Sequence, residues 1–440
     1  MSQGHTPPQS APSVEWLPAW DAGRGIDSVM ELGNTVFGAH TGAPSGVWSA
    51  PGRVNLIGEH TDYNQGLCLP IALPHRTYVA LRPSTNEDIQ LASRQGTQLW
   101  CTTWADLRPG NVSGWGTYAA GVAWALREAG HQVGGFDATV DSAVPLGASL
   151  SSSAALECAF AVALDSAFNL GLAETPEGRR ELVAACRRAE NDMAGAPTGG
   201  LDQMASMFCQ AGHALALDFR EGIPDAEAAR LVPFDLAAAG LTILVVDSRA
   251  PHALVDGQYA ERRNACQSAA ESLGIASLRE INPASLDATL ESLTDPVQVK
   301  RVRHVVTEIQ RTAEFIDVVQ AGLVTNGAAD QDRITHAGAL MNASHDSLRD
   351  DYQVTVPQTD LAVDASRAAG AIGARMTGGG FGGATIALVR QEDVERVAAT
   401  VAQEFASAGY TAPAFLESPP SGSAGRDLVV NDRAMRRVTP

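Results

Sequence analysis

The sequence predicts an α+β protein of two domains. Its 440 residues exceed the length at which a single hydrophobic core usually stops growing. Strand patterns and helix patterns are both present, but they do not alternate strictly along the chain. No strand pattern is followed by the glycine spacing of a Rossmann or Walker motif, so a doubly wound nucleotide-binding sheet is not indicated.

Short β-branched or alternating runs predict the strands. They lie at residues 54–57, 77–81, 136–144, 241–246 and 384–389. Apolar residues at helical spacing predict helices at 154–168, 179–192, 299–319 and 394–408. Gly171 and Gly409 are expected to end the first and the last of these helices.

A polar segment at residues 221–230 predicts the domain boundary. The expected units are a disordered tail at 1–14, an N-terminal domain at 15–222, a C-terminal domain at 223–428 and a tail at 429–440. No basic segment followed by an apolar one opens the chain, so a signal peptide is not expected. The longest apolar stretch is far shorter than the roughly 18 residues that a membrane span needs. No membrane contact is therefore expected.

The charge balance limits the ligands that the chain can attract. Its formal net charge is −19, from 50 acidic and 31 basic residues, which disfavours nonspecific binding to nucleic acid. A phosphate ligand must therefore be held locally, by backbone amides, a metal ion and a few cations. The six cysteines lie far apart and form no CxxC pair, which predicts buried thiols in a reducing, cytoplasmic compartment.

The first motif is a polar cluster at the end of a predicted strand, GRVNLIGEHTDYNQG at residues 52–66. Two carboxylates, an imidazole and a hydroxyl fall within the four positions Glu59 to Asp62. Such a set of donors and acceptors suits a polyhydroxylated ligand such as a sugar. A turn with satisfied surface side chains and a metal site are the alternatives.

The second motif is PLGASLSSSAALE at residues 145–157, where a strand leads into an alanine-rich helix. Small residues let the backbone approach a ligand, and the first turn of a helix offers free N–H groups and a favourable dipole to an anion. The motif predicts a phosphate cradle without a Walker lysine. Serine N-capping is the alternative, and it accounts for one of the three consecutive serines.

The third motif is RMTGGGFGGA at residues 375–384, with five glycines within six positions just before a predicted strand. Glycine in such number is tolerated where the backbone needs a positive φ or approaches a ligand closely, and a glycine-rich hairpin is the alternative. Between the second and third motifs lie two candidate carboxylates. Asp202 is a candidate base for a substrate hydroxyl or a helix N-cap, and Glu190 is a candidate magnesium ligand or a solvated helical charge.

Together, the three motifs resemble those of the GHMP kinase superfamily in their order and separation. Residues 52–66 are similar, nearly residue for residue, to the signature of its galactokinase family, and residues 341–352 and 421–425 resemble further galactokinase segments. The resemblance implies an N-terminal domain like the second domain of ribosomal protein S5, packed on a ferredoxin-like C-terminal domain. It also implies transfer of a phosphoryl group from ATP, with Mg²⁺, to the anomeric hydroxyl of galactose by a monomeric enzyme.

The resemblance also assigns roles by position. It implies that Asp202 faces the anomeric hydroxyl and that Arg53 lies beside it, near the transferring phosphoryl group. The implied sugar contacts are Glu59, His60, Thr61, Asp62, Gly200 and Tyr259. The implied phosphate contacts are Gly147, Ala148, Ser149, Leu150, Ser151, Ser152 and Ser153, with Trp115 near the adenine. Ser153 and Glu190 are the implied ligands of magnesium.

One position departs from the family pattern. The second motif usually carries glycine where this chain has Ser149, so the affinity for ATP is the property in question. Two alternatives to galactose phosphorylation stay open. One is a kinase for another sugar, such as N-acetylgalactosamine or arabinose, and the other is a sensor that binds galactose and ATP without catalysis. Asp202 also has two possible roles, as a proton acceptor and as an electrostatic positioner.

Overall fold

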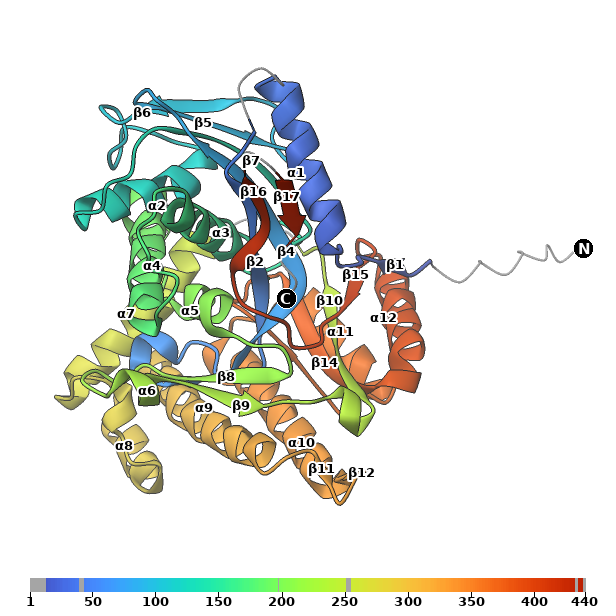
Figure 1. Cartoon of the computed structure of the whole chain (residues 1–440). Helices are drawn as coiled ribbons and strands as arrows, with labels where there is room; N and C mark the ends of the chain where they lie inside the picture. Colours follow the sequence, from blue (N-terminus) through green and yellow to red (C-terminus); the bar gives the residue numbers. More distant parts are fainter. Residues whose placement is uncertain (1–12, 39–42, 197, 251–254, 432–433, 438–440) are drawn as a thin grey trace, which may run out of the picture.

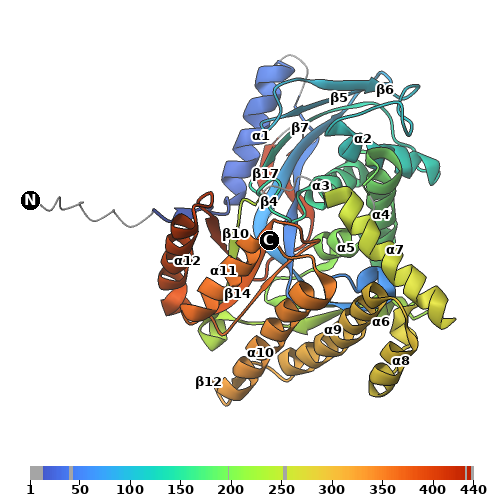
Figure 2. The same cartoon turned by 180° about the vertical axis from the view of Figure 1, so that it is seen from behind.

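The computed structural model describes residues 13–38, 43–196, 198–250, 255–431 and 434–437. The predicted N-terminal tail therefore lies, up to residue 12, outside the described residues. The described chain forms two halves, each built of helices packed against a sheet (Figures 1 and 2). No helix of these residues is long and apolar enough to cross a membrane.

A seven-stranded sheet organises the N-terminal half. Its strand order is β17 (Ala434–Arg437), β16 (Gly425–Asn431), β2 (Gly46–Asn55), β4 (Pro70–Pro83), β7 (Phe136–Ser142), β5 (Asp88–Ser93) and β6 (Trp100–Thr103). Successive side chains of β4 point to opposite faces. Val79 and Leu81 pack under α2 (Gly116–Glu128), α3 (Ser152–Ala167) and α4 (Pro176–Arg188), whereas Tyr78 and Ala80 pack under α1 (Ala22–Val36). Helices thus cover both faces.

A five-stranded sheet organises the C-terminal half. Its order is β1 (Glu15–Trp16), β15 (Ala414–Glu417), β10 (Leu241–Asp247), β14 (Ala384–Arg390) and β13 (Gly373–Met376). Leu244 and Val246 of β10 face α11 (Pro357–Ala368) and α12 (Val394–Ala408). Ile243 and Val245 face α9 (Pro296–Gln320) and α10 (Gln331–Ser347), in the core that joins the two halves.

The two ends of the chain cross between the halves. β16 pairs with β2 in the N-terminal sheet, and β1 pairs with β15 in the C-terminal sheet. Residues 429–431 and 434–437 lie in strands β16 and β17, so the expectation of a tail at 429–440 is corrected there. The predicted boundary at 222/223 falls inside the hairpin of β8 (His213–Asp218) and β9 (Ala229–Pro233).

The predicted strands and helices are confirmed, with local differences. α4 ends at Arg188, and a π-helical turn, η3 (Ala189–Ala194), replaces the last turn of the predicted helix. α3 ends before Phe168, so Gly171 is not its stop, whereas Gly409 caps α12 with a φ of 74°. The predicted strand at 54–57 overlaps only the last two residues of the much longer β2, which ends at Asn55.

Candidate active site

A polar cavity of about 190 Å³ lies where the two halves meet. That volume is over ten times the roughly 10–15 Å³ that one water molecule needs. The cavity is lined by Arg53, Asn55, Glu59, His60, Asp62, Glu190, Thr198, Gly199, Leu201, Asp202, Tyr259, Gly378 and Gly379. The structure therefore brings the first motif, the two candidate carboxylates and the glycine-rich loop into one site.

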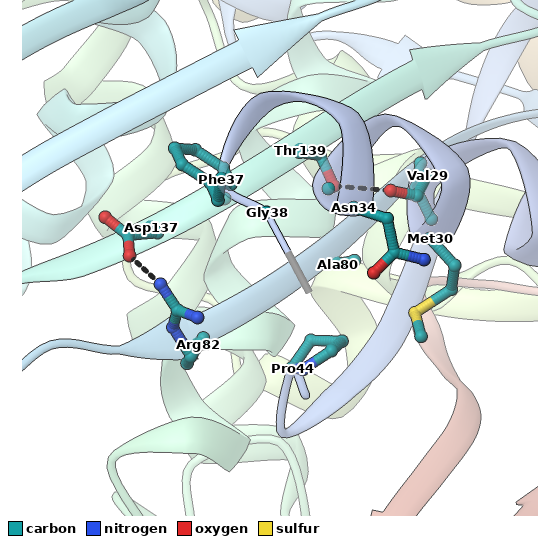
Figure 3. Close-up of a pocket in the computed structure, with 12 residues that line it drawn as sticks. Val29, Met30, Asn34, Phe37, Gly38, Pro44, Ala80, Arg82, Asp137 and Thr139 are labelled. Carbon is teal, nitrogen blue, oxygen red and sulfur yellow. Dashed lines mark hydrogen bonds and ion pairs between the residues drawn. The ribbon is translucent and has the colours of Figure 1, made fainter. Parts of the chain in front are cut away.

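A second cavity lies beside α1 and has a volume of only about 40 Å³ (Figure 3). Its lining is largely apolar, and its charged residues Arg82 and Asp137 are paired with each other. None of the three motifs reaches it. The polar cavity is therefore the candidate active site.

The carboxylate of Asp202 is bonded on both oxygens. Arg53 Nη2 lies 2.7 Å from Oδ1, and the Ser151 hydroxyl donates to Oδ2 at 2.6 Å. Arg53 also donates from Nη1 to the carbonyl oxygen of Ser149 at 2.8 Å. Asp202 lies in the first turn of α5 (Leu201–Phe208). Gly200 is the N-cap of that helix, so the N-cap alternative for Asp202 is wrong.

The second motif forms a tight loop that leads into α3. Gly147, Ser149 and Ser151 have φ values of 74°, 57° and 58°, in the left-handed region. Left-handed backbone costs roughly 1–2 kcal/mol at a residue with a side chain, which is tolerated at functional sites. Ser151 occupies the N-cap position, but its side chain makes no capping bond. The N-capping alternative is therefore wrong, and the N-terminal end of α3 remains suited to an anion.

Glu190 and Ser153 meet behind this loop. The Ser153 hydroxyl donates to Glu190 Oε1 at 2.9 Å, and Gln203 Nε2 donates to Oε2 at 2.6 Å. Glu190 is buried, so it is not a solvated helical charge. Burial, and then the charge of Asp202, raise the pKa of Glu190 to about 7.

The first motif is mostly buried rather than a surface turn. The carboxylate of Glu59 accepts the N–H of Gly378 at 3.0 Å and is ion-paired with Arg375. Asp62 lines the cavity, and burial, together with the nearby charge of Asp202, raises its pKa to about 6. Gly199 must lack a side chain, because a Cβ there would lie 1.9 Å from Asp62 Oδ2.

His60 borders the cavity but turns its ring into an aromatic cluster. Its Nδ1 is 2.8 Å from the hydroxyl of Tyr63, and its ring packs against Tyr259 and Tyr352. His60 Nε2 is buried, so neither ring nitrogen is presented to the cavity. Burial lowers the pKa of His60 well below its usual value, which favours the neutral imidazole.

Besides residues 147–153 of the second motif, the assigned residues Thr61, Gly200 and Trp115 lie outside the cavity lining. Thr61 is fully buried, and its hydroxyl contacts the carbonyl oxygens of Gly58 and Leu67 at 3.0 and 2.7 Å, so the expectation of a sugar contact is corrected. Gly200 lies between Gly199 and Leu201, which do line the cavity. Trp115 is half-buried at the start of α2, away from the lining residues.

Tyr259 and the glycine-rich loop close the cavity from the C-terminal half. Tyr259 comes from α7 (Val255–Leu273). The loop joins β13 to β14, and Gly378 and Gly380 have φ values of 84° and 81°. The third motif therefore forms a glycine-rich hairpin, which was the alternative interpretation of its sequence. Two residues of this hairpin, Gly378 and Gly379, also line the cavity.

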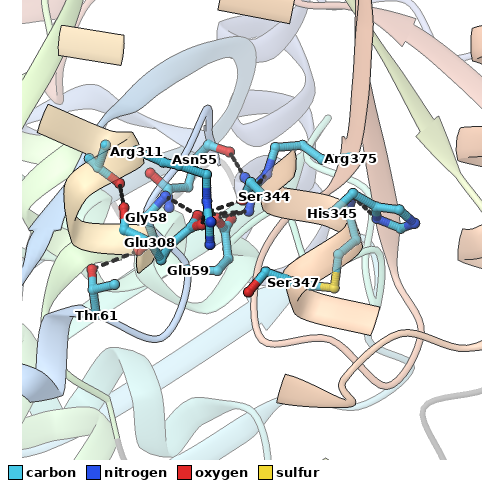
Figure 4. A network of polar contacts seen from close by, with 12 residues as sticks. Asn55, Gly58, Glu59, Thr61, Glu308, Arg311, Ser344, His345, Ser347 and Arg375 are labelled. Atoms are coloured by element: carbon cyan, nitrogen blue, oxygen red, sulfur yellow. Dashed lines mark hydrogen bonds and ion pairs between the residues drawn. The ribbon is translucent and has the colours of Figure 1, made fainter. Parts of the chain in front are cut away.

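The site also contains residues that had no predicted role, two of which, Asn55 and Arg375, lie within the first and third motifs. Asn55 lines the cavity, and Arg375, Glu308 and Ser344 form a buried network behind Glu59 (Figure 4). An arginine in the otherwise apolar strand GARM was the available sequence signal for this network. Among the described residues, no group of three or more His, Cys, Asp or Glu side chains could hold a metal ion, so the metal-site alternative for the first motif is not supported.

Comparison with known families agrees with this geometry. The galactokinase galactose-binding signature matches residues 35–83, the GHMP kinase N-terminal domain matches 117–210, and the GHMP kinase C-terminal model matches 327–407. The mevalonate kinase of Methanococcus jannaschii shares the fold at a TM-score of 0.58 and 15% identity, over 85% of this chain and 98% of that one. Fold and site together define a kinase of the GHMP class, as predicted.

Closer relatives narrow the class. The chain is 45% identical to the galactokinase of Streptomyces coelicolor over 91% of its own length and 98% of that protein. It is also 45% identical to the galactokinase of Mycobacterium tuberculosis, over 83% and 95% of the two chains. The crystal structure of Lactococcus lactis galactokinase complexed with galactose matches with a TM-score of 0.82 and 31% identity, over 91% of this chain and 99% of that one. The chain belongs to the galactokinase family.

Proposed function

We propose that this chain transfers the γ-phosphoryl group of ATP to the anomeric hydroxyl of D-galactose, giving galactose 1-phosphate. The observation that carries the proposal is the position of Asp202. Its carboxylate lines the same cavity as the polar cluster of the first motif. It is also hydrogen-bonded to Ser151 of the loop at residues 147–153, which we call the phosphate loop. A sugar hydroxyl at Asp202 would therefore lie beside bound nucleotide phosphates. The galactokinases among its relatives support galactose as the sugar.

The sugar end of the cavity offers both donors and acceptors. Asp62 supplies a carboxylate, Tyr259 a phenol and Asn55 a side-chain amide, and Glu59 adds a second, buried carboxylate. A hexose has hydroxyl groups around its whole ring, so such a mixed lining matches its hydrogen-bonding needs. Thr61 acts indirectly in this proposal, because its hydroxyl holds the loop that carries Glu59 to Asp62.

The phosphate end relies on backbone more than on charge. Residues Gly147 to Ser153 present main chain and the start of α3, where N–H groups and the helix dipole favour an anion. Arg53 is the cation of the cavity that faces this loop, since it contacts both Ser149 and Asp202. In a protein of net charge −19, this local arrangement is what would hold a polyphosphate.

Ser153 and Glu190 suit a magnesium ion. A hydroxyl and a carboxylate oxygen are hard donors, and Mg²⁺ is typically held by one or two protein groups together with substrate phosphates. The raised pKa of Glu190 reflects its burial beside Asp202, which the charge of Arg53 only partly offsets, and a bound Mg²⁺ would add positive charge there. When bound, the ion would offset charge on the phosphates.

In the proposed reaction, the anomeric oxygen forms a bond to the γ-phosphorus and the bond from that phosphorus to the leaving oxygen of ADP breaks. Asp202 accepts the hydroxyl proton or orients the hydroxyl for attack, and the ion pair with Arg53 holds the carboxylate in one position for either role. Arg53 also places positive charge near the transferring group, where charge develops in the transition state.

We also propose where the protein is located and whether it is a monomer. Six free cysteines, five of them buried, suit a reducing compartment, and we propose a cytoplasmic location on that basis. The expected monomer stays a prediction, which light scattering on the purified protein can test. The presence of Arg53, Asp202, Ser153 and Glu190 in one site favours an enzyme over a non-catalytic sensor.

The direct test is ATP-dependent turnover of the purified chain with a panel of sugars. Galactose should be phosphorylated in preference to N-acetylgalactosamine and arabinose, and turnover should require Mg²⁺. A strong preference for an N-acetylated sugar would overturn the substrate assignment. Tight binding of galactose and ATP without any turnover would support the sensor alternative instead.

A further inference from the structure

Arg375 lies behind the sugar end of the cavity rather than in it. It belongs to β13, just before the glycine-rich loop, and its side chain is fully buried. A buried guanidinium is costly unless every donor has a partner and the charge is paired. The contacts of Arg375 therefore indicate what the residue does.

The guanidinium of Arg375 contacts residues of the first motif and of α10. Nη2 is ion-paired with the carboxylate of Glu59, and Nη1 lies 3.2 Å from the carbonyl oxygens of both Asn55 and Leu56 (Figure 4). Nε donates to the hydroxyl of Ser344, on α10, at 3.1 Å. The planar fork of arginine can make these contacts at once, whereas the single ammonium of lysine cannot.

Glu308 fixes Arg375 from the far side. Its Oε1 lies 3.9 Å from Arg375 Nη2 and accepts the Ser344 hydroxyl at 2.5 Å and the N–H of Gly58 at 3.1 Å. Burial raises the pKa of Glu308, but the charges around it have the larger combined effect and lower that pKa to about 2. They include Arg375 and Arg311, whose Nε lies 2.9 Å from Glu308 Oε2. Glu308 is thus an ionised anchor that never reaches the cavity.

The same network orients Glu59. Besides Arg375, its carboxylate accepts the N–H of Gly378 at 3.0 Å and the hydroxyl of Thr377 at 3.3 Å. Only 3% of the side chain is exposed, and Glu59 is one of the residues that line the cavity. Without Arg375, the carboxylate would lose its ion-pair partner and the bond that holds it in this direction.

We propose that Arg375 is a positioning residue for sugar recognition, holding the carboxylate of Glu59 at the cavity while Glu308 and Ser344 hold Arg375. The inference rests on the proposed function in one respect, because Glu59 has to contact the sugar. It adds a residue from the C-terminal sheet that acts on the sugar through a side chain of the first motif.

The main test compares Arg375→Lys with Arg311→Lys. Both variants keep a charge next to a buried glutamate and lose the fork, but only Arg375 contacts Glu59. Arg375→Lys should raise the KM for galactose about ten- to a hundredfold, with the KM for ATP and kcat changed less than about threefold. Arg311→Lys should leave all three constants within about twofold of the wild type.

A second variant guards against loss of folding. Ser344→Ala removes one bond to Arg375 and keeps its ion pair, so the KM for galactose should rise about two- to fivefold. Monodeoxygalactoses supply a readout that a purely structural role would not change. The wild type should discriminate most strongly against the sugar lacking the hydroxyl that Glu59 binds, and Arg375→Lys should reduce that discrimination.

The outcomes separate this inference from the proposed function. A wild-type chain that does not phosphorylate galactose contradicts the proposed function. An active wild type, with an Arg375→Lys variant of lowered thermal stability but unchanged galactose KM, overturns the positioning role alone. If Arg375→Lys cannot be purified folded, Ser344→Ala decides, and an unchanged galactose KM in that variant overturns the role.

Discussion

The guanidinium of Arg53 lies 2.7 Å from the carboxylate of Asp202, and each residue also contacts the phosphate loop. Arg53 lies near the end of β2 in the first motif, whereas Asp202 is the second residue of α5, after a turn that contains Gly199 and Gly200. The ion pair therefore joins the proposed sugar-binding and phosphate-binding parts of the site at one carboxylate.

Removing the carboxylate of Asp202 should separate binding from catalysis. Asp202→Ala should lower kcat by about 10²–10⁴-fold or more, because no other carboxylate is held by both Arg53 and Ser151 in the described site. Galactose binding should be retained in part and can be measured by calorimetry. Phosphorylation at the wild-type rate would contradict the catalytic role of Asp202.

Galactose affinity should depend on pH through Asp62. Its carboxyl has a pKa raised to about 6, and the ionised form is the stronger hydrogen-bond acceptor for sugar hydroxyls. Protonation below that pKa should weaken binding, so the Kd at pH 5 should be about tenfold higher than at pH 7.5. Calorimetry across this range checks the slope, and Asp62→Asn should abolish it. A slope that persists in Asp62→Asn would assign the titration to another group.

Ser149 should limit the affinity for ATP. The left-handed φ of Ser149, 57°, is strained for a residue with a side chain. The Cβ of Ser149 is also close to the glycine-rich loop, because a Cβ added at Gly378 would lie 3.0 Å from it. Ser149→Gly should lower the KM for ATP a few-fold and leave galactose binding unchanged. Gly147→Ala is the matched control, because it makes the opposite change by adding a Cβ at a φ of 74° in the same loop. No atom lies within 4 Å of that Cβ, so only backbone strain should act, and the KM for ATP should rise. An unaltered KM for ATP in Ser149→Gly would show that the serine is accommodated.

Thr61 should matter for stability rather than for chemistry. Thr61→Val keeps the shape of the side chain but leaves the carbonyl oxygens of Gly58 and Leu67 without its hydroxyl. Chemical denaturation should show a loss of about 1–3 kcal/mol in the free energy of unfolding. In steady-state assays, kcat should stay within about twofold of the wild type. A large rise in the galactose KM at unchanged stability would restore Thr61 as a sugar contact.

Magnesium dependence should trace to Ser153 and Glu190. Removing Mg²⁺ with a chelator should abolish turnover, and Glu190→Ala should raise the Mg²⁺ concentration needed for half-maximal rate by about tenfold or more. Titrating the rate with Mg²⁺ at saturating ATP and galactose measures this shift. Ser292→Ala, at the exposed end of α8 (Leu286–Ser292), is a suitable control and should behave as the wild type.

The sequence predicted the elements whose patterns are local. β10 and α12, for example, are strongly apolar or amphipathic and were placed almost to the residue. Most of β2 was missed because Pro51 and Gly52 interrupt its pattern, and the strand accommodates them with a shift of register. α7 was missed because its buried positions are largely alanine and cysteine, which give a weak apolar stripe.

From the residues alone, the site was predictable only as separate pieces, and the family resemblance was needed to place Arg53 beside Asp202. The motifs indicated a polar cluster, an amide loop and candidate carboxylates, but no local pattern states that Arg375 and Glu59 are paired across the two halves. The sequence also does not show which side chains of a motif are buried by the fold and cannot contact a ligand. Thr61 was assigned to the sugar by its place in the motif, whereas the fold turns its hydroxyl to the backbone.

The most direct test of the proposed function is the product formed from galactose and ATP with Mg²⁺. We predict stoichiometric ADP and a sugar phosphate whose phosphorus NMR coupling places the phosphate on the anomeric carbon, with no product from Asp202→Ala. Phosphate on a different hydroxyl, or equal turnover by the variant, would contradict the account.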